Sequence, residues 1–151
     1  SIVAKQINYD GTRAADGDFK FAVNAQANAY GLEWGVQGTA GIRTDTAATD
    51  GTSIDNAASS AFGLQAYLHV FAFTGTSVTV TIQESSDNAV GDPFANVVGG
   101  SFTAATGITS ERIATASGLT VERYLRVVTT GTFTNAQFAV NIVRNDTATT
   151  F

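Results

Sequence analysis

The chain contains one histidine, His69, within the nearly apolar stretch LQAYLHVFAF of residues 64–73. A histidine can act as a general base or bind a metal, but either role needs partners: a nucleophile to deprotonate, or further ligands. The sequence has no G-x-S-x-G motif, no second histidine and no cysteine. On a strand, His69 shares a face with Tyr67, Phe71 and Phe73. We therefore interpret His69 as a packed or interface residue and predict no catalytic residues.

Two acidic segments could bind a cation. Residues 84–92, ESSDNAVGD, and residues 9–18, YDGTRAADGD, gather the oxygen ligands that Ca²⁺ prefers on a flexible loop. Neither has the spacing of an EF-hand loop, and Asp, Asn and Gly are also the residues that tight turns require. We therefore favour turn roles and predict neither a metal nor a cofactor. The weak calcium candidates are Glu84, Asp87, Asn88 and Asp92.

Aromatic residues in the segment AYGLEWG, residues 29–35, offer a third kind of site. Tyr30 and Trp34 could stack on a sugar ring, as a module that binds host surface glycan would require. A tryptophan flanked by glycine can instead bury its ring and fasten a linker to a neighbouring domain, and we favour this anchor role. An enzyme that degrades glycan would need two carboxylates across a cleft, and no spacing in the sequence pairs them.

Composition argues against several classes of function. The 151 residues suit one domain, or one domain with an arm. Only 14% are charged, against the roughly 25% of typical soluble domains. The net charge is −5 and Lys5 and Lys20 are the only lysines, so we expect no nucleic-acid binding. No apolar run approaches the length of about 18 residues that predicts a membrane span. We also expect no signal peptide, and the absence of cysteine excludes disulfides.

Alternating segments predict β-strands. Residues 77–85, SVTVTIQES, place Val78, Val80 and Ile82 on one face and polar residues on the other. This is the pattern of a half-buried strand. The preceding segment FTGTS contains turn residues, so we expect residues 64–73 and this strand to form a local hairpin.

A second local hairpin is expected further along the chain. Residues 122–130 and 136–144 both alternate, and TGTFTN joins them. Weaker strands are predicted near residues 94–98, 101–105 and 111–114. Short strands at this spacing suggest an all-β fold, an antiparallel β-sandwich of jelly-roll or Ig-like type.

The first third of the chain differs from the rest. SIVAKQINYD and GDFKFAVNAQA each predict a strand, and the turn-rich segment between them predicts an N-terminal β-hairpin or arm. Residues 41–61 are polar, small and aperiodic, which is typical of a loop or linker. We therefore expect an extended β arm at 1–30, a linker with an anchoring tryptophan at 31–62, and the β-sandwich at 63–151.

The chain is similar to a known group of proteins over continuous stretches of sequence, and not through a catalytic motif. The segments GLQAYLHVFAFTG and RYLRVVTTGTF carry most of it, within a likeness that extends over residues 2–151. In these segments the sequence resembles virion structural proteins of tailed bacteriophages, in particular major tail or tail-tube proteins. Members of that group often carry a longer N-terminal part before a segment like residues 3–28. This sequence begins at Ser1 without such a part, and this departure from the group leaves a capsid decoration protein as an alternative.

The resemblance implies a non-enzymatic virion subunit, assembled in the host bacterial cytoplasm. Its partners would be copies of itself in cyclic rings and other virion proteins, with a glycan-binding adsorption module as a further alternative. Extended N-terminal strands would pair with neighbours by β-augmentation. The expected assembly residues are Ile2, Val3, Ile7, Phe19, Phe21, Val23 and Trp34. Tail versus capsid, ring size and host stay open.

Overall fold

The computed structural model describes residues 4–13, 17, 19–27 and 33–149, which form antiparallel strands and no helix. The prediction of an all-β fold is confirmed. Because these residues form no helix, none of them belongs to a helix that could cross a membrane. The chain divides into two units, Ser1–Trp34 and Gly35–Phe151.

The first unit is a β-hairpin, as the sequence predicts. β1 (Ala4–Arg13) and β2 (Phe19–Ala27) form a two-stranded sheet of their own. Their register shifts once, at Ile7, which has no partner residue on β2. Because side chains of a strand alternate between its faces, the alternate β2 positions share one face, and their side chains are exposed: Lys20, Ala22, Asn24 and Gln26.

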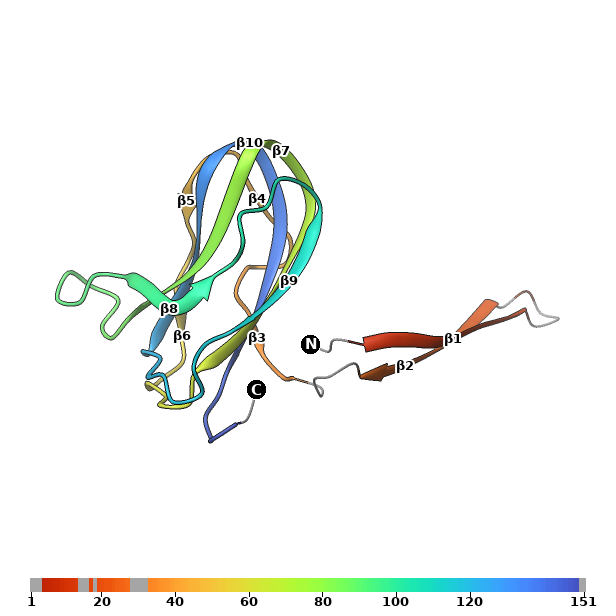
Figure 1. Ribbon diagram of the computed structural model, residues 1–151, viewed down its shortest axis with the longest axis horizontal. Helices are drawn as coiled ribbons and strands as arrows, with labels where there is room; N and C mark the ends of the chain where they lie inside the picture. The colour runs from red at the N-terminus through yellow and green to blue at the C-terminus, as the bar shows by residue number, and fades with distance from the viewer. Residues whose placement is uncertain (1–3, 14–16, 18, 28–32, 150–151) are drawn as a thin grey trace. The chain divides into compact units, whose positions relative to one another are not determined.

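Two long strands dominate the second unit. β7 (Leu64–Ser85) and β10 (Tyr124–Arg144) pair from end to end. Figure 1 shows both strands bending over the top of this unit, so that each has two limbs on either side of the core. The sheet order is β3-β10-β7-β8, with β4, β5 and β6 also paired to β10 and β9 also paired to β7. The result is one antiparallel sheet that curls into a half-barrel.

The two local hairpins expected from the sequence are wrong. Each of the two long segments forms one continuous strand, which pairs with the other rather than folding back on itself. The Gly-Thr segments that look like turns lie at the bend, where Gly131 is opposite Val78. A Cβ atom on Gly131 would lie 2.3 Å from the carbonyl oxygen of Ser77. Glycine therefore allows two backbones to approach closely at this point, and does not reverse the chain.

Bulges preserve the inward direction of the apolar side chains through the bend. Val70 and Ala72 of β7 lie opposite the consecutive residues Phe138 and Gln137 of β10, which leaves Phe71 as an extra residue. An extra residue reverses the alternation of the residues that follow it. Compensating shifts of this kind let the buried positions continue on both limbs of each strand.

The core lies between the limbs of the two long strands. Both limbs supply aliphatic side chains, and Phe138 is the largest of the fully buried ones. The main members are Leu64, Leu68, Val78, Val80, Ile82, Val121, Leu125, Val127, Phe138, Val140 and Ile142. Burial of these side chains is the main source of stability for the second unit.

Short strands flank the long pair on both sides. The segment expected to be a linker supplies four of them, all paired with β10: β3 (Val36–Gln37), β4 (Arg43–Asp45), β5 (Thr49–Asp50) and β6 (Ile54–Asp55). β8 (Ala95–Ser101) and β9 (Thr109–Ala114) pair with β7. Two of the weaker predicted strands therefore exist. The third, near 101–105, is reduced to a single bridge between Ala105 and Val78.

Candidate functional site

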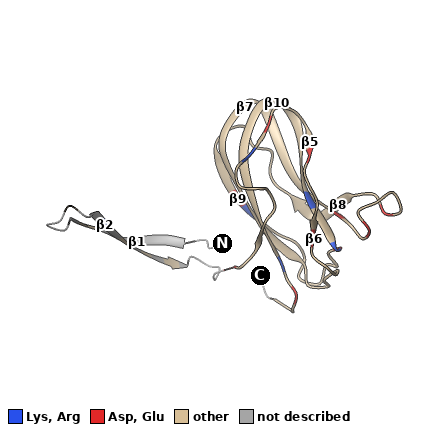
Figure 2. Ribbon diagram, turned by 180° about the vertical axis from the view of Figure 1, so that it is seen from behind, with Lys and Arg blue, Asp and Glu red and all other residues tan. Residues whose placement is uncertain are grey.

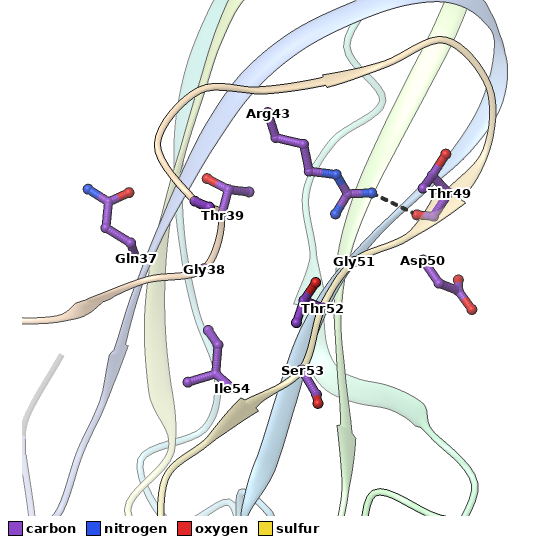
Figure 3. Close-up of a pocket in the computed structure, with 11 residues that line it drawn as sticks. Gln37, Gly38, Thr39, Arg43, Thr49, Asp50, Gly51, Thr52, Ser53 and Ile54 are labelled. Atoms are coloured by element: carbon purple, nitrogen blue, oxygen red, sulfur yellow. Dashed lines mark hydrogen bonds between the residues drawn. The ribbon is translucent and has the colours of Figure 1, made fainter.

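A hollow of about 520 Å³ lies beside β10, where the short strands leave the sheet edge incomplete. Figure 3 shows its lining, which comes from the loop after β3 and from the segment that runs from β5 to β6. Its lining residues are Gln37, Gly38, Thr39, Ala40, Arg43, Thr49, Asp50, Gly51, Thr52, Ser53 and Ile54. The volume lies within the roughly 300–1,000 Å³ of small-molecule sites in proteins.

Two glycines hold the lining against β10. The amide of Gly38 donates to the Val140 carbonyl oxygen over 2.7 Å, and the amide of Gly51 donates to the Val127 carbonyl oxygen over 2.9 Å. A Cβ atom on Gly51 would lie 2.4 Å from that same carbonyl oxygen. Any larger residue would therefore push this side of the hollow away from the sheet.

Arg43 fastens the lining from within. Its Nε and Nη2 atoms donate to both carboxylate oxygens of Asp45 at 2.8 and 2.7 Å, and its Nη1 donates to the Val127 carbonyl at 2.7 Å. Nη2 also donates to the Thr49 carbonyl, the bond drawn in Figure 3. The guanidinium lies 5.4 Å from the centre of the Phe138 ring, a cation–π contact. The N–H groups of Arg43 are bonded to Asp45 and to two backbone carbonyls, and its charge is paired with that of Asp45. Arg43 therefore positions the lining and is not available to bind an anion.

The partner of Arg43 is buried. Asp45 is 5% exposed, and it also accepts a hydrogen bond of 2.6 Å from the Thr129 hydroxyl. A buried carboxylate that loses its cation becomes an unpaired buried charge, which is strongly destabilising.

We therefore expect Arg43→Met to lower the free energy of unfolding by about 2–3 kcal/mol, because the pair is nearly but not wholly withdrawn from water. Urea denaturation followed by circular dichroism would measure this loss. The matched control is Arg123→Met, since Arg123 forms the same bidentate pair with Asp55 on the exposed surface. Little change is expected there, and equal losses in the two variants would contradict the role given to Asp45.

The calcium candidates lie around the loop between β7 and β8, where Figure 2 shows acidic residues. The two aspartates accept hydrogen bonds from the loop itself: Asp92 accepts from the Ser86 amide at 2.7 Å, and Asp87 accepts from the Ala89 amide at 2.8 Å. Asn88 has a positive φ of 56°, which Asn tolerates better than most residues. Among the described residues, no three His, Asp or Glu side chains are placed to hold a metal ion. Asp87, Asn88 and Asp92 therefore shape the turn between β7 and β8.

Two glutamates near this loop titrate abnormally. Burial raises the pKa of Glu84, whose carboxylate accepts a hydrogen bond of 2.9 Å from the Glu122 amide. Burial, followed by the negative charge of Asp92, raises the pKa of Glu122. Hydrogen bonds from Ser86 lower the pKa of Asp92. The folded chain therefore binds protons at the two glutamates more tightly than the unfolded chain does.

This arrangement predicts a pH effect that Glu84→Gln should remove in part. A raised pKa in the folded state gives stability that is fully present below the unfolded value and is lost as the pH rises through the folded value. The stability of the wild type should thus fall as the pH rises above about 4.5. The glutamine oxygen can still accept the Glu122 amide, so the variant should gain stability relative to wild type between pH 4 and pH 7. Urea denaturation at both values tests this, and a pH-independent difference would contradict it.

His69 lies on the exposed outer face of β7. Its Nδ1 atom is 2.9 Å from the Ser110 hydroxyl oxygen, and its ring stacks on Phe71 with centroids 6.4 Å apart. In the described part of the chain, no carboxylate is bonded to the other ring nitrogen. Of the aromatic residues expected on its face, Tyr67 is buried, Phe71 is half-exposed and Phe73 packs against the core. The ring contact with Phe71 and the hydrogen bond with Ser110 are consistent with the expected role of His69 as a packed or interface residue, which stays a prediction.

The remaining predicted sites lie in the first unit. Trp34, the last residue of this unit, is 83% exposed, and its anchor role stays a prediction. Ile7, Phe19, Phe21 and Val23 lie on the two strands of the hairpin. Three further candidates fall outside the described residues: Ile2, Val3 and Tyr30.

Sequence reasoning missed the hollow and the Arg43–Asp45 clamp, the bidentate ion pair beside it. The clamp and most of the lining come from residues 41–61, which the lack of periodicity marks as a loop, and the rest of the lining comes from residues 37–40. One local signal was present: Arg43 and Asp45 are two residues apart, which places them on the same face of an extended strand. Their buried partner Thr129 is remote in sequence, and no local pattern identifies it.

Comparisons with known proteins identify no relative. No family model matches the chain, no curated protein matches it, and no solved structure matches it.

Proposed function

We propose that this chain is a non-enzymatic structural protein that assembles with copies of itself by strand addition at the β1–β2 hairpin. The observation that carries the proposal is that β1 and β2 form a sheet of only two strands. Each strand of such a sheet has one edge whose backbone N–H and C=O groups have no strand partner. These edges are templates for pairing with another chain.

Two further properties support self-assembly. An isolated two-stranded hairpin is marginally stable in water, and a third strand or a packed face stabilises it. In the sequence, Phe19, Phe21 and Val23 alternate with the exposed positions of β2. A neighbouring subunit that packs over these alternate positions would therefore also cover apolar residues. The low proportion of charged residues, 14%, suits a surface that neighbouring subunits cover.

The sequence resemblance supplies the setting of this proposal. We assign the chain to the virion of a tailed bacteriophage, as a subunit of the tail tube, with a capsid decoration protein as the alternative. Under this assignment the two limbs of the curled sheet correspond to the two layers of the expected jelly-roll or Ig-like β-sandwich. Immunogold electron microscopy of intact virions separates the cases: label along the tail shaft supports the tail, and label confined to the capsid supports decoration.

Assembly is testable with charges placed on the hairpin. We expect the double variant Phe21→Asp, Val23→Asp to stay monomeric where the wild type forms oligomers, because a neighbour packed over these positions would bury two carboxylates. Ala22→Asp is the matched control, since Ala22 lies on the exposed face of the same strand. Sedimentation velocity measures the oligomeric state. A wild type that is monomeric at its highest soluble concentration, or a control as defective as the double variant, would contradict the proposal.

The fluorescence of Trp34 provides a second measurement of oligomer formation. It is the only tryptophan and is 83% exposed in the single chain. If subunit contacts cover the region next to the hairpin, its fluorescence should shift to shorter wavelength as oligomers form. The shift should be absent in the double variant.

A further inference from the structure

The hollow beside β10 contains polar side chains that the protein itself leaves unused. Gln37 and Thr52 are exposed and Ser53 is half-buried, and within the described residues none of the three makes a side-chain hydrogen bond to the protein, although all three line the hollow. Gln37 belongs to β3, and the two hydroxyl residues follow β5, so the free groups flank the hollow from two separate segments (Figure 3). Together they offer one amide and two hydroxyl groups to a ligand.

The charges around the hollow are already neutralised. Arg43 is paired with Asp45, and the Asp50 carboxylate lies 3.0 Å from the Arg126 guanidinium. Among the described lining residues there is thus no unpaired cation to attract a phosphate or a carboxylate. The rest of the lining consists of Ile54, Ala40, the two glycines, and Thr39 and Thr49, whose hydroxyls donate to backbone carbonyls of the chain itself.

We propose that this hollow binds a neutral saccharide. Hydroxyl and amide side chains can donate to and accept from the hydroxyl groups of a sugar, and the apolar lining suits the C–H faces of its ring. The ring hydroxyls carry no charge, which matches a site whose charged residues are paired with each other. All residues of this site belong to the second unit, and the proposal does not depend on self-assembly.

The lining is held in place before any ligand arrives. Backbone bonds fix its two glycines to β10, and the Thr39 hydroxyl is tied both to the Gly41 carbonyl, at 2.8 Å, and to the Val140 amide, at 3.2 Å. Arg43 then ties its own strand, β4, to the Thr49 carbonyl on the β5 side of the hollow and to the Val127 carbonyl of β10. A site that is already ordered loses little entropy on binding, so a few hydrogen bonds suffice for weak, specific recognition.

The test is an NMR titration of the full-length protein with glucose, galactose, N-acetylglucosamine and maltose, and with inorganic phosphate as a charged probe. We expect at least one of the sugars to give saturable shifts of backbone amide signals confined to residues 37–54. The double variant Thr52→Val, Ser53→Ala should bind that sugar at least tenfold more weakly, because each lost hydrogen bond is worth roughly fivefold. The spectrum of each variant also shows whether it folds.

Two matched variants sharpen the result. Thr120→Val removes an exposed hydroxyl outside the hollow and should leave binding unchanged. Ala40→Leu adds bulk to the lining without removing a hydrogen bond, and should weaken binding even if the hydroxyl variant does not fold. Saturable binding of phosphate instead of sugar, shifts that persist in the double variant and in Ala40→Leu, or no saturable shift with any of the four sugars would each overturn the proposal.

Discussion

Gly131→Ala is expected to lower the free energy of unfolding by about 3–5 kcal/mol, since it combines backbone strain with a steric overlap. Gly131 has a φ of 123°, a conformation that residues with a Cβ atom rarely adopt. The added methyl group would also lie 2.3 Å from the Ser77 carbonyl oxygen, which belongs to the opposing strand. Because β7 and β10 are at their bend here, neither backbone can retreat without disturbing the pairing on both limbs.

The control for this experiment is Gly107→Ala. An added Cβ at Gly107 has open space around it, with no heavy atom within 4 Å. Urea denaturation of the two variants and the wild type compares them directly, and we expect Gly107→Ala to stay within about 0.5 kcal/mol of wild type. A Gly131 variant as stable as its control would show that the bend does not require close backbone contact.

Phe138→Ala is expected to cost about 3–5 kcal/mol of unfolding free energy, through lost burial and the cavity that remains. Phe138 is fully buried between the limbs of the long strands, and the guanidinium of Arg43 lies over its ring, 5.4 Å from the ring centre. The substitution therefore weakens both the core and the support beneath the hollow. Calorimetry should show a lower melting temperature.

The matched control is Phe71→Ala. Phe71 is the extra residue of a bulge and is 46% exposed, so its removal leaves no closed cavity. We expect a loss of less than about 1 kcal/mol. If the two phenylalanines contributed equally, the core would not lie between the limbs of β7 and β10.

The sequence by itself determined the main strands and, where their alternation is regular, which side chains share a face. Alternation at residues 77–85 placed Val78, Val80 and Ile82 on one face of a strand, and all three are buried. The two N-terminal strands were equally evident. This information is local: it depends on side-chain type and on the two-residue period of an extended chain.

Only the tertiary structure decided which strands pair and where the hollow forms. A Gly-Thr segment within an alternating sequence fits a tight turn and a bent strand equally well, since glycine permits both. The choice was made by pairing between segments remote in sequence, which placed Gly131 opposite Val78. For the same reason Arg43 and Asp45 became a clamp only when β10 brought the Val127 carbonyl and the Thr129 hydroxyl beside them. A local pattern has no information about a partner that lies some eighty residues away.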